Sequence, residues 1–177
     1  MVYTKYKFTP GDIAAYLIAA DLPYKQCNRV IDDLFENYNA LIVFPYRKEL
    51  RRLRSETKDI MLRLESDKET LDEADRISEE TGSIKNRYSS REPDRFGAYF
   101  KLIKLHLMYS GISCYKIKLK VLLNDFGYKY RTAPFREKLS RTLHALRLIP
   151  YVDGHKCYDM HPVRSHKTIA FRLDDEQ

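Results

Sequence analysis

The sequence predicts a mainly α-helical protein, in which N-terminal helices and a long coiled-coil-like helix precede a C-terminal α+β module that ends in a small β-hairpin. Apolar residues recur at helical spacing between residues 9 and 45. A heptad pattern then runs through residues 46–81 without a Gly or Pro. We therefore predict an N-terminal helical region at 1–45, an oligomerisation helix at 46–81, a linker at 82–93 and a basic module at 94–177.

The positive charge of the chain is concentrated near its C-terminus. Residues 99–172 contain fifteen Lys or Arg and four Asp or Glu, which gives a net charge of +11. Residues 1–93 contain sixteen basic and seventeen acidic residues, a net charge of −1. A basic segment of this kind is typical of a surface that binds phosphates.

The composition restricts the class of protein. An apolar content of 44% is enough for a packed core. No apolar run, including residues 40–44, is long enough to cross a bilayer, and residues 1–8 lack the apolar run of a signal peptide. Three widely spaced cysteines favour a reducing compartment over a disulfide framework. We expect a cytoplasmic protein without a membrane partner.

The N-terminal region predicts two short helices. Thr9 followed by Pro10 is typical of a helix start, because the hydroxyl caps free N–H groups and Pro is tolerated in the first turn. A second helix is predicted from about Tyr24, and Pro45 interrupts the pattern that follows it. The region is near neutral, so we predict a role in packing or partner binding.

The heptad segment predicts a helix that associates. Its basic half, residues 47–63, has seven basic and three acidic residues, whereas residues 65–80 have two basic and eight acidic. If two copies pair here, an antiparallel arrangement places opposite charges together; the alternative is that the helix folds back on its own chain. The predicted oligomerisation residues are the apolar seam positions Leu50, Leu53, Ile60, Leu64, Leu71 and Ala74.

The basic module predicts three helices. The first covers residues 94–109, and the second follows Ser113 and ends at Gly127. Residues 116–121 also alternate between Lys and apolar side chains, so a strand is the alternative there. The third helix begins after Thr132, runs to about Leu148, and has a buried stripe composed of Phe135, Leu139, Leu143 and Leu146.

Two strands follow the third helix. Residues 148–152 and 167–173 are apolar or alternating, and Asp153-Gly154 is a strong hairpin-turn signal. Residues 157–166 form a long insert between them.

Helix, helix, turn, helix and β-hairpin in this order resembles the winged helix-turn-helix superfamily, over about 80 residues and by element order alone. The resemblance implies that the third helix reads the major groove while the hairpin contacts the DNA backbone or minor groove. The implied reading residues are Ser140, Arg141 and His144. The implied phosphate and wing contacts are Arg131, Arg136, Lys138, Arg147, His155, Lys156, Arg164 and Lys167.

These observations predict a duplex DNA-binding protein that acts as a homodimer or higher oligomer, with transcriptional regulation as its role. RNA is an open alternative as the polyanion, and an interaction or scaffold protein of a larger assembly is the second hypothesis. A remote third is a small recombinase- or nuclease-like enzyme, because His144 and Arg147 accompany Arg131 and either Tyr151 or Tyr158. No P-loop, GxGxxG, GxSxG or HExxH motif occurs, so we expect no catalytic residues and no cofactor.

The insert also contains residue types that bind zinc. His155, Cys157, His161 and His166 are spaced as a conceivable ligand set, but no CxxC pair accompanies them. We expect polar contacts from these side chains and no bound metal.

Overall fold

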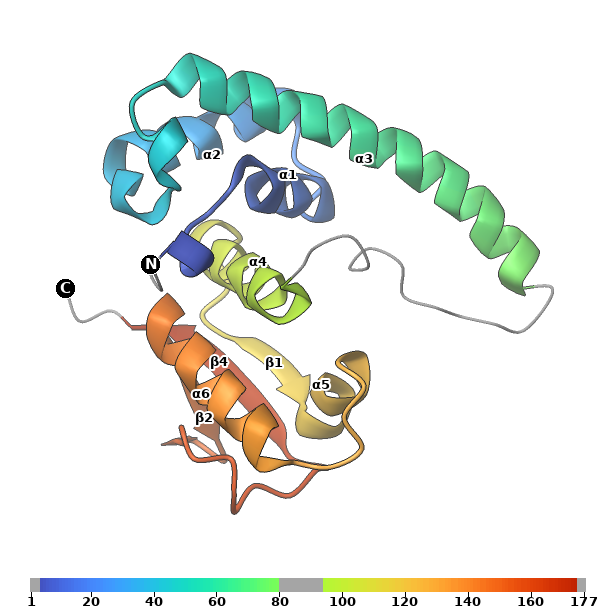
Figure 1. Cartoon of the computed structure of the whole chain (residues 1–177), viewed down its shortest axis with the longest axis vertical. Helices are drawn as coiled ribbons and strands as arrows, with labels where there is room; N and C mark the ends of the chain where they lie inside the picture. The colour runs from blue at the N-terminus through green and yellow to red at the C-terminus, as the bar shows by residue number, and fades with distance from the viewer. Residues whose placement is uncertain (1–3, 80–93, 175–177) are drawn as a thin grey trace. The chain divides into compact units, whose positions relative to one another are not determined.

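The computed structural model describes residues 4–79 and 94–174 (Figure 1). Contacts divide them into two compact units. The helical unit lies within Lys7–Ala98, and the sheet unit consists of residues 4–6 and 99–174. The predicted linker at 82–93 lies outside the described residues.

The helical unit begins with α1 (Pro10–Ala19), and the predicted start of this helix is confirmed. The Asp12 N–H donates to Thr9 Oγ1 at 3.2 Å, and the Thr9 N–H donates to Asp12 Oδ2 at 2.8 Å. This reciprocal pair is a capping box, which satisfies N–H groups that the first turn leaves free. α1 then buries Ile13, Ala14, Tyr16 and Leu17.

Helix α2 (Tyr24–Asn37) follows and buries Cys27, Val30, Ile31 and Leu34. Two short 3₁₀ helices, η2 (Asn39–Leu41) and η3 (Phe44–Tyr46), lead into the third helix. Between them Ile42 forms a parallel bridge with Phe8, and both side chains are buried. The apolar run at residues 40–44 therefore contributes to the core of this unit.

Helix α3 (Leu50–Glu79) packs along α1 and α2 of its own unit. Leu53 and Thr57, which belong to the predicted heptad seam, are fully buried, and Leu50, Ile60 and Leu64 are half-buried. The prediction of a free coiled-coil-like helix is wrong, because this part of the seam is already covered within the chain. The side chains of Leu71 and Ala74 lie outside the described residues.

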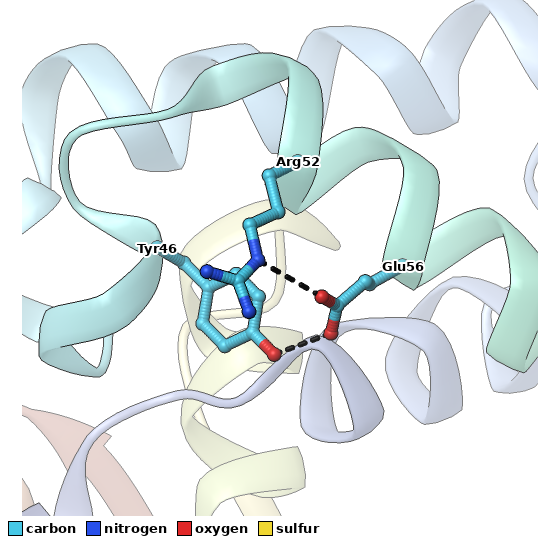
Figure 2. Close-up of polar contacts among 3 residues, drawn as sticks. All are labelled: Tyr46, Arg52 and Glu56. Atoms are coloured by element: carbon cyan, nitrogen blue, oxygen red, sulfur yellow. Dashed lines mark hydrogen bonds and ion pairs between the residues drawn. The ribbon is translucent and has the colours of Figure 1, made fainter.

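A polar cluster joins η3 to the start of α3 (Figure 2). The hydroxyl of Tyr46 donates to Glu56 Oε2, and Arg52 Nε lies 3.1 Å from Glu56 Oε1. The Arg52 guanidinium also lies over the Tyr46 ring, 5.1 Å from its centroid. The bonds from Tyr46 and Arg52 lower the pKa of Glu56, so the carboxylate form is favoured.

The sheet unit contains most of α4 (Arg95–Tyr109) and then β1 (Tyr115–Lys118), α5 (Leu119–Asp125) and α6 (Ala133–Leu146). Strands β2 (Leu148–Val152), β3 (His155–Lys156) and β4 (Thr168–Leu173) complete it. The short helix η1 (Thr4–Tyr6) contacts α6. Asp153 and Gly154 make the predicted turn between β2 and β3, with φ angles of 51° and 86°.

The strands form one antiparallel sheet in the order β1-β4-β2-β3. The helix predicted after Ser113 is wrong in its first half, because residues 115–118 pair with β4 and only residues 119–125 are helical. Alternation of Lys and apolar side chains suits a strand with one covered face, and this tertiary pairing overrides the helical pattern.

Aromatic contacts join α4 to the sheet and join α4 and α6 to the segment that follows α5. Phe100 of α4 contacts Phe171 of β4 edge to face at 5.4 Å, and Tyr99 contacts Phe126 at 5.3 Å. Phe135 of α6 contacts Tyr128 at 5.0 Å. We call the face that contains Phe171 the inner face of the sheet and the opposite one its outer face.

The predicted fold class is therefore wrong in two respects. Within the described residues the chain has six α-helices and a four-stranded antiparallel sheet, in place of a small hairpin. Its third helix is an integral part of a packed helical unit instead of a separate coiled-coil element. None of the described helices is both long and apolar enough to cross a membrane.

Candidate nucleic-acid interface

Helix α6 has well-defined ends. Thr132 is its N-cap, and Thr132 Oγ1 accepts from the Phe135 N–H at 3.4 Å. Arg147 ends the helix in the left-handed conformation with a φ of 53°, and its N–H donates to the His144 carbonyl at 3.1 Å. The predicted third helix is thus confirmed.

One side of α6 is buried and the rest divides into two flanks. Phe135, Leu139, Leu143 and Leu146 are buried, as predicted. At roughly 100° per residue, positions 136, 140 and 144 lie on one flank and positions 137, 138, 141 and 145 on the other. We call these the covered flank and the open flank.

The insert of residues 157–166 lies against the covered flank. The Tyr158 ring stacks on His144 with 4.2 Å between centroids and an angle of 10° between the planes. Arg136 and Ser140 on the same flank are half-buried, and Arg136 Nε is shielded from solvent without a hydrogen-bond partner. Of the predicted reading residues, Ser140 is therefore half-buried beside the insert, whereas His144 stays exposed although its ring stacks on Tyr158.

Arg131 holds this insert in place. Its Nη1 donates to the carbonyls of Met160 at 3.2 Å and His161 at 2.8 Å, and also to that of Val163. Met160 and Val163 are buried, so the insert is anchored in the core as well. Arg131 was predicted to bind DNA, but its guanidinium is bound to backbone carbonyls of its own unit.

The insert is also closed at its C-terminal end. The Lys120 N–H donates to the Ser165 carbonyl at 2.8 Å, and the Leu119 N–H donates to the Lys167 carbonyl at 2.9 Å. Lys167 Nζ lies 2.7 Å from Asp153 Oδ2, so the charge of this predicted wing residue is paired within the unit.

The open flank of α6 carries the exposed cations Lys138 and Arg141, together with Glu137 and Ala145. Arg147 is exposed just beyond the end of the helix. Two of the predicted contacts thus lie side by side on an accessible helix surface. Glu137 reduces the net charge there and provides a carboxylate acceptor.

The remaining predicted wing residues lie in two places. His155 and Lys156 are exposed on β3, and Arg164 is exposed in the insert. Lys156 is paired in register with Tyr151 of β2, so both side chains lie on the outer face of the sheet.

The outer face has further cations that sequence reasoning did not predict as site residues. Lys116 pairs in register with Ala170, and Arg172 is paired with Ile149, so both belong to this face. Lys118, two residues beyond Lys116, belongs to it as well. Lys116, Lys118, Lys156 and Arg172 are all exposed. The positive charge of the sheet unit is therefore spread over several surfaces, among them the open flank, the outer face and the insert. The alternation in residues 116–118 was the signal that could have revealed the outer face.

The four side chains considered as a conceivable zinc set, His155, Cys157, His161 and His166, do not come together. Within residues 4–79 and 94–174, no three His, Cys, Asp or Glu side chains are placed to hold one metal ion. Burial, and secondarily Asp159, raises the pKa of the Cys157 thiol, and its Sγ donates to the Asp159 carbonyl at 3.1 Å. A thiol that resists ionisation is a poor zinc ligand.

The residues named for a recombinase-like site are used in other ways. His144 and Tyr158 do meet, but as stacked rings, and Arg131 binds carbonyls. Burial, followed by Asp174 and Tyr151, raises the pKa of the Tyr158 phenol, which therefore stays protonated near neutral pH.

The chain was compared with known proteins. No protein-family model, no curated protein and no solved structure matches it.

Proposed function

We propose that this chain is a duplex DNA-binding protein, with the open flank of α6 as the surface that enters the major groove. The proposal rests on one observation above all. α6 is capped and buried along one side, while Lys138 and Arg141 are exposed on an accessible flank. Such a helix can insert into a major groove without rearrangement of its domain.

Charge supports the same conclusion. The segment 99–172 has a net charge of +11, and phosphate contacts supply most of the sequence-independent affinity of DNA-binding proteins. The order of helices and strands in the sheet unit resembles the winged helix-turn-helix order expected from the sequence. Transcriptional regulation is the role we propose for DNA occupancy of this kind.

The contacts on the covered flank restrict which residues of α6 are proposed to bind DNA. His144 is stacked on Tyr158 and Arg136 is half-buried, so direct contacts are assigned to Lys138 and Arg141 instead. Arg147 follows the helix and is placed to meet a neighbouring phosphate. An interaction or scaffold role is the alternative, since folds of this kind also dock proteins.

Pairing of two copies is a separate part of the proposal. A groove of about 350 Å³ lies between α2 and α3, and Tyr24 and Leu62 at this groove are 62% and 57% exposed. The basic segment 47–63 contributes Arg54 and Lys58 to the lining of this groove. The acidic segment 65–80 of a second copy has the opposite charge. We expect Leu62→Asp to shift sedimentation toward the monomer; an unchanged profile would refute pairing through this groove.

The DNA proposal is tested with two double variants that remove equal charge. Lys138→Ala with Arg141→Ala alters the open flank, whereas Lys116→Ala with Lys118→Ala alters the outer face. Binding of the full chain to a labelled duplex of about 20 base pairs is measured by fluorescence anisotropy at two salt concentrations. We expect the open-flank variant to lose about tenfold or more in affinity and the outer-face variant to lose clearly less.

Three results would overturn this assignment. Equal losses of affinity in both variants would mean that DNA binding depends only on the total charge of the protein. A larger loss in the outer-face variant would place the interface on the sheet. Tighter binding of a duplex RNA than of the duplex DNA would identify RNA as the ligand. It would also exclude entry of α6 into a major groove, because the narrow major groove of duplex RNA does not admit a helix.

A further inference from the structure

The sheet unit contains a hollow of about 530 Å³ that is separate from the open flank of α6. Its apolar wall is formed by Leu107 near the end of α4, Ile112 in the following loop and Ile149 on β2. Lys156, Arg172 and Tyr151 line it from the outer face of the sheet. A volume of this size is within the range of small-molecule sites, roughly 300–1,000 Å³.

The cations of the hollow are organised around one aromatic ring. The Arg172 guanidinium carbon lies 4.7 Å from the centroid of the Tyr151 ring. Lys156 is the register partner of Tyr151 on the neighbouring strand. A guanidinium that rests on a ring is held in a defined plane, and its N–H groups match two oxygens of one carboxylate or phosphate.

We propose that this hollow binds a small organic anion: a single carboxylate or phosphate group attached to an apolar body. Arg172 and Lys156 would bind the oxyanion, and Leu107, Ile112 and Ile149 would contact the apolar part. Because Ile149 is the register partner of Arg172, the oxyanion and part of the apolar body would bind next to each other. This inference is independent of DNA binding, since none of its residues lies on α6.

Two polar groups complete the lining. Ser113 is exposed and can donate its hydroxyl to an oxyanion, while Asp174 adds a carboxylate. The backbone of Asp174 is held by its N–H, which donates to the Arg147 carbonyl at 3.1 Å. Because Asp174 repels a second anionic group, we expect ligands with one anionic group to bind better than dicarboxylates.

Calorimetric titration of the full chain with phenyl phosphate tests the proposal. Inorganic phosphate is the comparison without an apolar body, and phenol is the comparison without charge. We expect phenyl phosphate to bind about tenfold more tightly than either. Arg172→Gln is expected to weaken its binding about tenfold, whereas Arg164→Gln, an exposed arginine outside the hollow, changes it less than about twofold.

A second variant distinguishes a loss of ligand binding from a loss of folding. Ile112→Ser shortens the apolar wall at a side chain that is already 41% exposed, and circular dichroism checks that each variant is folded. It should weaken phenyl phosphate binding but leave inorganic phosphate binding unchanged. Equal affinity for phenyl phosphate and inorganic phosphate, or equal losses in Arg172→Gln and Arg164→Gln, would overturn the proposal.

Discussion

The helical unit and the sheet unit differ in the balance between cations and carboxylates. In the helical unit Arg54 is bonded to Asp32 at 2.5 Å, and Arg52 is bonded to Glu56. In the sheet unit Arg131 binds backbone carbonyls and Arg172 lies over a ring. Neither kind of contact is exclusive, because Arg47 of the helical unit donates to two carbonyls and Lys167 of the sheet unit pairs with Asp153. The difference lies in the surplus: segment 99–172 has fifteen basic and four acidic residues, so it has more cations than its carboxylates can pair.

The comparison also shows that net charge does not define a surface. The net charge of +11 predicts one basic face, but register places Lys116 and Arg172 on the outer face while Lys138 and Arg141 lie on α6. Two surfaces of similar sign can then serve two different anions. The predictions below test this division and the packing on which it depends.

The largest effect is expected in the helical unit. Leu53 is fully buried in α3, so Leu53→Ala should lower the free energy of unfolding by about 2–5 kcal/mol. Because α3 packs on α1 of the same chain, the loss should be independent of protein concentration. Urea denaturation at two protein concentrations measures both quantities. A loss that shrinks on dilution would mean that the seam is intermolecular after all.

An intermediate effect is expected at Arg131 in the sheet unit. Arg131→Gln removes charged hydrogen bonds to the insert, and we expect a loss of about 1–3 kcal/mol in the free energy of unfolding. Its effect on duplex affinity should be smaller than that of the open-flank variant. Undiminished stability combined with weaker DNA binding would restore Arg131 as a phosphate contact.

The smallest effect is expected at the polar cluster of Figure 2. Tyr46→Phe removes the hydroxyl that donates to Glu56 and helps to lower its pKa. A lowered pKa means that this stabilisation is present above the unfolded value, about 4.3, and is lost as pH falls through the folded value. Thermal unfolding should show the variant slightly less stable at pH 7.

The direction in which the difference in melting temperature changes with pH tests the bond between Tyr46 and Glu56. The difference in melting temperature between the variant and the parent should close as the solution is acidified below the pKa of Glu56. Arg52 remains present in both proteins and serves as the internal control. A gap that widens in acid would contradict the proposed bond.

Local signals in the sequence predicted several element boundaries correctly. Thr9 and Thr132 cap helices because hydroxyl groups satisfy N–H groups that lie within three residues. Asp153-Gly154 forms the hairpin turn because both residues tolerate positive φ. The third helix and its buried stripe were also confirmed, since a 3.6-residue period directly reflects one covered side.

Features that depend on contacts between residues far apart in the sequence could not be predicted from local patterns. β1 joins β4 through partners such as Tyr115 and Phe171, which are far apart in sequence. The heptad period of α3 indicated a covered stripe but not which element covers it. The stack of Tyr158 on His144 depends on the path of the insert, and no local pattern specifies that path.

The most direct test of the central claim is to map the DNA contact by NMR on the full chain. Amide shifts are recorded while a short duplex is titrated. We expect the largest changes at residues 137–141 of α6, with smaller changes on β1 and β3. Changes confined to the outer face of the sheet, or to α2 and α3, would contradict it.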